Sequence, residues 1–204
     1  FNDKKDLERY PRTLEKDIQM LEKAGCDLIF TPDEKVIYPK PDTRKFVFGK
    51  LDQVLEGKAR PGHFNGVAQV VSRLFEMVEP DKAFFGLKDY QQFLVIKELT
   101  KQLKLNIEII GCATQRDEEG LALSSRNTLL NEDEYDNATY IPIWMEEVRK
   151  LALRYKISQI KARIETLVSQ QSGMKLDYFE ICNAETLEPL KEFSEADKYI
   201  ALIA

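Results

Sequence analysis

The feature that most constrains the fold is a repeated alternation of helical stripes with short, almost wholly apolar runs. Apolar residues recur at helical spacing over residues 67–78, and the apolar run 83–85 follows them. A second helical stripe over 95–103 precedes an apolar run over 105–110, which Gly111 ends. Strands that are apolar throughout are typical of a parallel sheet that helices cover on both faces. The sequence therefore predicts an α/β fold.

A similar unit precedes these two. Leu14, Ile18 and Leu21 recur at helical spacing, and Gly25 then provides a helix stop. The short apolar run 28–30 follows. We therefore expect a helix and then a strand in this part of the chain.

The last third has a different pattern. Two helical stripes over 144–151 and 157–167 are followed by two strand-like segments at 176–182 and 198–203. This order predicts a small α+β domain at the C-terminus. The polar stretch 114–120 is the expected hinge between the two domains.

Composition excludes several classes of function. Acidic residues outnumber basic ones by 35 to 30 and no basic stripe with interleaved aromatic residues occurs, so the sequence disfavours a nucleic acid as partner. The chain has one histidine, His63, and its three cysteines are far apart, so we expect no side-chain metal site. No apolar run reaches the roughly 20 residues of a membrane span, and we expect a soluble cytoplasmic protein without a membrane partner.

The first candidate site is the segment 86–92, which follows an apolar run. In an open α/β sheet the ligand binds beyond the carboxyl ends of the strands, where this segment would lie. Gly86 would let the backbone approach a ligand, and Lys88 could place its charge on phosphate oxygens. The alternative is a capping box in which Asp89 and Gln92 stabilise the next helix.

The second candidate is a loop with two hydroxyls beside an arginine: Ser124, Ser125 and Arg126. A guanidinium binds phosphate oxygens in a fixed fork, and hydroxyls donate hydrogen bonds to them. The alternative is an ordinary serine-rich surface loop. A third candidate holds Arg60 and His63, with the alternative that His63 bonds backbone near a helix start and Asn65 caps that helix.

Taken together, these segments resemble the pantothenate synthetase (pantoate:β-alanine ligase) family, over almost the whole chain. The matching motifs occur in the family's order at plausible spacing, and they are residues 10–13, 60–67, 85–92, 120–127 and 184–189. One such match would be weak, but five in order are specific.

The resemblance implies a Rossmann-like parallel sheet of the HIGH nucleotidyltransferase superfamily. It divides the chain into a nucleotide- and pantoate-binding domain over 1–112 and a small α+β lid domain over 113–204. It also implies a homodimeric, cytoplasmic ligase on the route to coenzyme A. Such an enzyme uses ATP with Mg²⁺ to convert pantoate to pantoyl adenylate, and β-alanine then displaces AMP to give pantothenate.

The resemblance also assigns residues. Lys88 and Arg126 are the expected catalytic groups, and Gln92 is expected to bind pantoate. The expected ATP contacts are Gly86, Leu87, Lys88, Asp89, Gln115, Leu123, Ser124, Ser125 and Arg126. Leu87 stands where the family usually has glutamate, which a backbone contact tolerates.

The family's H-x-G-H histidines, which bind ATP, do not occur in residues 1–204. We therefore expect this polypeptide by itself to lack synthetase activity. Two alternatives remain open at this point: a related nucleotidyltransferase with another substrate, and a non-catalytic nucleotide-binding or dimerisation module.

Overall fold

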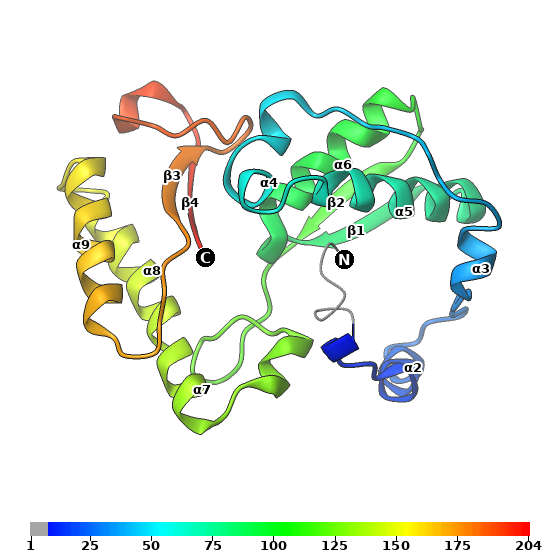
Figure 1. Ribbon diagram of the computed structural model, residues 1–204, viewed down its shortest axis with the longest axis horizontal. Helices are drawn as coiled ribbons and strands as arrows, with labels where there is room; N and C mark the ends of the chain where they lie inside the picture. The colour runs from blue at the N-terminus through cyan, green and yellow to red at the C-terminus, as the bar shows by residue number, and fades with distance from the viewer. Residues whose placement is uncertain (1–7) are drawn as a thin grey trace.

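The computed structural model describes residues 8–204, and Figure 1 shows its arrangement. The N-terminal part contains a parallel pair of strands, β1 (Lys82–Gly86) and β2 (Glu108–Cys112). Helix α6 (Tyr90–Gln102) connects the two strands, and helix α5 (His63–Val78) packs beside α6. This helix-and-parallel-strand order confirms the predicted α/β fold, although β2 begins three residues later than expected and runs through Gly111.

The described residues cover only one face of this strand pair. Phe85 points toward α5, where its ring meets the edge of the Phe75 ring at a centroid distance of 6.4 Å. Phe84 points to the opposite face, because side chains alternate along a strand, and it is 64% exposed. The expectation of helices on both faces is therefore wrong for residues 8–204, since α5 and α6 lie together on one side.

The core of the N-terminal part lies between α5, α6 and the chain that leads to them. Its buried members are Phe48, Phe64, Ala68, Val95 and Leu99. Two short helices, η1 (Gly49–Asp52) and α4 (Leu55–Ala59), connect this region to α5. The apolar residues at helical spacing over 67–78 and 95–103 thus lie on the sides of α5 and α6 that face this core.

The first described segment contains helix α2 (Leu14–Lys23), as predicted, and the short helix α3 (Glu34–Ile37). Residues 28–30 form no strand, so that prediction is wrong. Leu28 is 78% exposed, and no described strand runs beside this segment to pair with its backbone. Three apolar residues do not make a strand when they have neither a hydrogen-bonding neighbour nor a surface to cover.

An extended segment then crosses α5 and is fastened to it by polar contacts. The Gln69 side chain donates hydrogen bonds to the carbonyls of Asp42 and Arg44, at 3.0 and 2.8 Å. The Asp42 side chain is 2% exposed and accepts hydrogen bonds from Arg44 and Arg73, and Arg44 also pairs with the more exposed Glu76. The Arg44 hydrogen bond lowers the pKa of Asp42 far below its ordinary value.

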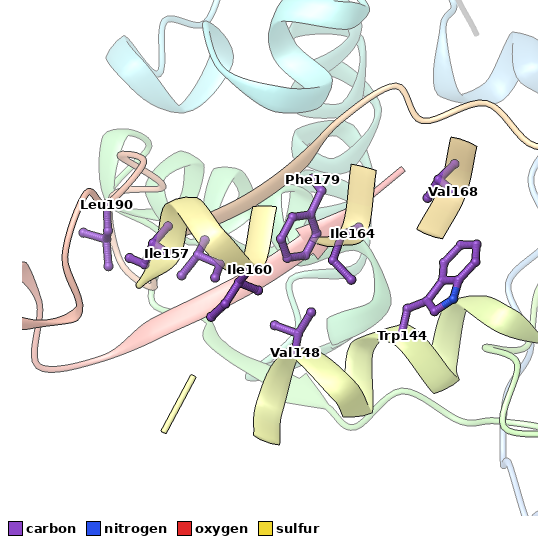
Figure 2. Close-up of a cluster of buried hydrophobic side chains, with 9 residues drawn as sticks. Trp144, Val148, Ile157, Ile160, Ile164, Val168, Phe179 and Leu190 are labelled. Atoms are coloured by element: carbon purple, nitrogen blue, oxygen red, sulfur yellow. The ribbon is translucent and has the colours of Figure 1, made fainter. Parts of the chain in front are cut away.

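The C-terminal part is α+β, as predicted. It contains η3 (Ser125–Leu129), α7 (Glu132–Ala138), α8 (Tyr140–Leu151), α9 (Ile157–Gln170), β3 (Phe179–Asn183), η4 (Phe193–Glu195) and β4 (Tyr199–Ile203). Strands β3 and β4 pair antiparallel. Figure 2 shows the core where α8 and α9 pack against β3, with Trp144, Val148 and Phe179 pointing toward the α9 stripe.

A second apolar cluster joins the two parts of the chain. We call it the seam cluster, and its buried members are Leu55, Leu94, Cys182 and Leu187. Figure 1 shows β3 and β4 between helices α8 and α9 and the N-terminal part. The Tyr90 hydroxyl donates to the Ala184 carbonyl at 2.9 Å, which adds a polar contact at this seam. The two parts are therefore packed together through buried side chains.

Across residues 8–204, none of the helices has both the length and the apolar character that a membrane-spanning helix needs.

Candidate active site

A cavity of about 580 Å³ lies where the loop after β1 faces the C-terminal part. Lys88, Asp89 and Gln92 line it from the first predicted site, and Ser124 lines it from the second. Leu87 also lies in its wall. The structure thus brings members of two loops, more than thirty positions apart in the sequence, to one cavity.

Not every predicted residue reaches this cavity. The ones outside its wall are Gly86, Gln115, Leu123, Ser125 and Arg126. A larger cavity of about 1010 Å³, between α4 and α9, contains none of the predicted residues. The 580 Å³ cavity is therefore the candidate active site.

The loop after β1 begins at Gly86 and forms the short helix η2 (Leu87–Asp89) before α6 starts. A Cβ added to Gly86 would meet no atom within 4 Å, so the fold itself does not require a glycine there. The Lys88 ammonium lies 3.7 Å from an Asp89 carboxylate oxygen, and both side chains are substantially exposed. A partly exposed ammonium at the end of a strand can meet phosphate oxygens that enter the cavity.

The capping alternative for this segment is wrong. Asp89 occupies the N-cap position of α6, but its side chain makes no capping hydrogen bond. Gln92 contributes to the cavity wall instead of reaching back to the helix start. The side chains of Asp89 and Gln92 are therefore not engaged in capping α6.

The paired glutamines have different roles. Gln91 is 5% exposed, and its amide nitrogen donates to the carbonyls of Leu51 and Val54 at 2.7 and 2.9 Å. Its side-chain oxygen accepts from the Glu56 backbone N–H at 3.1 Å. Gln91 therefore fixes the start of α4, while Gln92 remains half-buried in the cavity wall.

The second loop is a compact turn. Leu123 donates its backbone N–H to the Gln115 carbonyl at 2.9 Å, and Ser124 accepts at 3.3 Å from the Arg126 N–H. The Ser125 hydroxyl donates to the Tyr10 hydroxyl oxygen at 3.2 Å, and the Arg126 guanidinium lies 5.0 Å from the centre of the Tyr10 ring. Ser125 and Arg126 thus contact the N-terminal segment.

The third candidate segment also lines the cavity, through Arg60 and His63. Helix α5 begins at His63 with Gly62 as its N-cap, and Asn65 accepts a hydrogen bond from the Phe46 N–H at 2.8 Å, so the prediction that Asn65 caps the helix is wrong. Burial, and then the nearby Arg60 charge, lowers the pKa of His63 below 6.5. His63 is therefore mainly neutral at pH 7.

Two lining residues gave no signal in the sequence. Glu56 of α4 lies 3.8 Å from the Arg60 guanidinium, and the Tyr178 hydroxyl donates to its other carboxylate oxygen at 3.3 Å. Burial and the Glu56 carboxylate raise the pKa of Tyr178 above its ordinary value. No motif joins positions 56 and 178, because only the packing of the C-terminal part on α4 brings them together.

Comparisons with known proteins identify the family. The model of the pantoate-beta-alanine ligase family matches residues 1–204. The pantothenate synthetase of Bacteroides thetaiotaomicron is 44% identical over 196 residues, which are 96% of this chain and 70% of that protein. The Bacteroides fragilis pantothenate synthetase is 43% identical over 203 residues, covering 100% of this chain and 72% of that protein.

Solved structures agree with this match. A crystal structure of the Thermus thermophilus pantothenate synthetase has a TM-score of 0.86 and 40% identity, over 91% of this chain and 68% of that chain. The Francisella tularensis pantoate-beta-alanine ligase, solved in complex with beta-gamma ATP and β-alanine, has a TM-score of 0.74 and 36% identity, over 88% of this chain and 66% of that chain. The chain described above belongs to the pantoate-beta-alanine ligase family.

Proposed function

We propose that the chain serves the ATP-dependent condensation of pantoate with β-alanine, which yields pantothenate, AMP and pyrophosphate, in an enzyme that also supplies the family's H-x-G-H histidines. Family membership over residues 1–204 supports this reaction, and the Francisella relative binds ATP and β-alanine. The single observation that carries the proposal is the meeting of Lys88, Gln92 and Ser124 at one cavity, because they come from the two loops that the family resemblance assigns to nucleotide and pantoate.

The reaction proceeds in two displacements. In the first, an oxygen of the pantoate carboxylate attacks the α-phosphorus of ATP, and the bond to the β-phosphate oxygen breaks to release pyrophosphate. In the second, the neutral amine of β-alanine attacks the carbonyl carbon of pantoyl adenylate. The bond from that carbon to the phosphate oxygen breaks, AMP leaves, and the amine gives up a proton. Magnesium enters with the nucleotide as Mg–ATP and is part of the substrate.

Charge stabilisation is the main requirement of the first displacement. Negative charge grows on the phosphate oxygens as the bond to pyrophosphate breaks, and a fixed cation beside them lowers the barrier. We assign this role to Lys88, whose ammonium is partly exposed at the cavity. Arg126 is the second catalytic cation in this proposal, and it would have to move from Tyr10 to reach the cavity.

The nucleotide contacts proposed here come from both loops. We propose that the backbone at Gly86 and Leu87, with Asp89, contacts ATP from one side. The contacts proposed on the other side are Gln115, Leu123, Ser124 and Ser125. Gln92 is assigned to pantoate because its half-buried amide can donate to and accept from the hydroxyls of this acid.

Arg60 is a further cation in the same cavity wall. The carboxylate of β-alanine does not react, so it can stay paired with a fixed guanidinium throughout the second displacement. The reacting pantoate carboxylate must leave such a pair in order to attack phosphorus. We therefore assign Arg60 to the carboxylate of β-alanine, with His63 beside it as a neutral polar group.

We also propose that the enzyme is a cytoplasmic homodimer, as the family resemblance implies, and that residues 113–204 act as its smaller domain. Light scattering behind size-exclusion chromatography tests the dimer directly.

Isotope exchange between pyrophosphate and ATP tests the reaction. An enzyme that contains this chain together with the H-x-G-H histidines should catalyse this exchange when pantoate is present, and β-alanine should then convert the adenylate to pantothenate. Residues 1–204 by themselves should show no exchange. A panel of other hydroxy acids and fatty acids provides the control. Exchange with another acid but not with pantoate would identify a different nucleotidyltransferase, and nucleotide binding with no exchange for any acid would indicate a non-catalytic module.

A further inference from the structure

We propose that Tyr178 is a positioning residue for the second displacement, which it serves by holding Glu56 so that Arg60 stays available to the carboxylate of β-alanine. This inference rests on the function proposed above. Tyr178 belongs to the segment that leads into β3. A residue of the C-terminal part would therefore determine how far Glu56 neutralises Arg60 in the part of the cavity wall that the N-terminal part forms.

The carboxylate of Glu56 is shared between two partners. Its Oε1 accepts the Tyr178 hydroxyl at 3.3 Å, and its Oε2 lies 3.8 Å from the Arg60 guanidinium. All three residues line the candidate active site. The Glu56–Arg60 distance is at the long end of an ion pair and well beyond the 2.7–2.9 Å of a charge-assisted hydrogen bond. Arg60 therefore retains donors for a second anion.

The Tyr178 hydroxyl keeps this division in place. A glutamate in a short helix and an arginine four residues later at its C-cap can close into a tight pair when nothing else holds the carboxylate. Arg60 would then be neutralised by its own helix, and a substrate carboxylate would have to displace Glu56. With one oxygen held by the phenol, the carboxylate is restrained from turning fully toward the guanidinium.

Tyr178 is itself fixed by the surrounding structure. Its backbone N–H and carbonyl both bond to Ala204, at 3.1 and 3.0 Å, at the end of β4. Its ring packs against the seam cluster, and the side chain is half-buried. Gln91 fixes the other side of the contact by accepting the Glu56 backbone N–H. The Tyr178–Glu56 hydrogen bond therefore joins two immobilised elements.

The test is the Tyr178→Phe variant of the protein, which removes one oxygen and keeps the ring. The KM for β-alanine should rise roughly five- to tenfold, the size expected when one ordinary hydrogen bond is lost. The pantoate-dependent pyrophosphate exchange should stay within about twofold, because the first displacement does not use β-alanine. A purely structural role would not produce this selective change.

A double-mutant cycle ties the effect to Glu56. In a Glu56→Gln background the Tyr178→Phe change should alter the β-alanine KM by less than about twofold, because the charge that it restrains is already gone. Tyr135→Phe is the matched control for stability, since it removes a hydrogen bond from a tyrosine hydroxyl to a carboxylate, that of Asp117, and neither residue lines the candidate active site. Its midpoint of unfolding should fall about as far as that of Tyr178→Phe, without the selective rise in KM.

Two results would overturn this inference and leave the proposed function intact. One is an unchanged β-alanine KM in Tyr178→Phe. The other is a rise in the β-alanine KM on Tyr178→Phe that is equally large in the unmodified and in the Glu56→Gln backgrounds. Absence of pyrophosphate exchange in the unmodified enzyme that also contains the H-x-G-H histidines would instead overturn the proposed function, and this inference with it.

Discussion

The Arg126 guanidinium lies over the ring of Tyr10, 5.0 Å from its centre, and the Ser125 hydroxyl donates to the Tyr10 hydroxyl oxygen. One tyrosine of the N-terminal segment therefore holds two of the residues that we assign to ATP. Both lie outside the wall of the candidate active site, so the proposed nucleotide contact requires them to leave Tyr10.

The Tyr10→Leu variant should consequently bind ATP more tightly. A cation–π contact at an exposed site contributes about 0.5–1 kcal/mol, and removing this competing contact should lower the KM for ATP about two- to fivefold. Steady-state kinetics with ATP as the varied substrate provide the measurement. Tyr10→Phe keeps the ring, so its KM for ATP should lie between those of the unmodified protein and of Tyr10→Leu. A raised KM for ATP in Tyr10→Leu would mean that Tyr10 helps to organise the loop for ATP.

Lys88→Ala should reduce pyrophosphate exchange roughly one hundred- to one thousandfold, as expected when one preorganised donor to a developing charge is removed. Lys82 is a matched control, because it lies at the other end of β1 and forms a similarly exposed ion pair with Glu108 at 3.4 Å. Lys82→Ala should retain nearly full exchange. Equal rates in Lys88→Ala and the unmodified protein would remove Lys88 from the mechanism.

Two glycines at the same edge of the sheet should respond in opposite ways. A Cβ at Gly111 would lie 2.7 Å from the Leu87 side chain, so Gly111→Ala must displace Leu87 and should lower stability by about 1 kcal/mol. Gly86→Ala meets open space and should leave stability within about 0.5 kcal/mol while it weakens ATP binding. Urea denaturation and ATP titration of both variants measure the two effects separately, and a large loss of stability in Gly86→Ala would contradict the assignment.

His63 should titrate below its ordinary pKa of about 6.5, because burial and then the Arg60 charge disfavour its protonated form. Between the lowered pKa and 6.5 the unfolded chain binds more protons than the folded one, so the contribution of His63 to stability increases with pH across this window. An NMR titration of the imidazole resonance that disappears in His63→Gln gives the value. Arg60→Gln should move the midpoint upward but leave it below 6.5, since burial remains the larger cause.

Asp42→Asn should destabilise the fold by about 2 kcal/mol, because two guanidinium groups lose a carboxylate whose side chain is 2% exposed. Glu76→Gln is the control in the same network, and its 44% exposed side chain should cost less than about 0.5 kcal/mol. Because the pKa of Asp42 is lowered on folding, its stabilisation is complete above roughly pH 4 and declines as the pH falls below that value. Urea denaturation from pH 3 to pH 7 should show a smaller acid-side decline in Asp42→Asn.

Local pattern was sufficient for the parts of the site that are continuous in sequence. Lys88, Asp89 and Gln92 follow an apolar strand in the sequence, and this position predicted that they lie beside a cavity. The prediction holds because ligands bind beyond the carboxyl ends of parallel strands. The sequence pattern indicates that Gly111 ends a strand, whereas in the structure its absent side chain provides room for Leu87. That role depends on a neighbouring loop, which spacing along the chain does not reveal.

Contacts between distant segments could not be predicted from the residues. The Tyr178–Glu56 hydrogen bond spans 122 positions, and neither residue lies in a motif. The two adjacent glutamines gave no indication of which would turn inward, because the carbonyls that capture Gln91 belong to an irregular segment. At residues 28–30 the sequence predicts an element that the structure does not contain, because an apolar segment without a pairing neighbour forms no strand.

The seam cluster limits how this molecule can move and melt. Leu55 and Leu94 share buried surface with Cys182 and Leu187, so separating the two halves exposes apolar side chains of both, in addition to the core that each half has of its own. An outward rigid-body movement of residues 113–204 would expose these side chains to water, which costs free energy. A movement of the short segment Ser124 to Arg126 alone avoids this exposure, so we expect that segment to open and close the site. For the same reason the two halves should denature as one cooperative unit, with a single calorimetric peak.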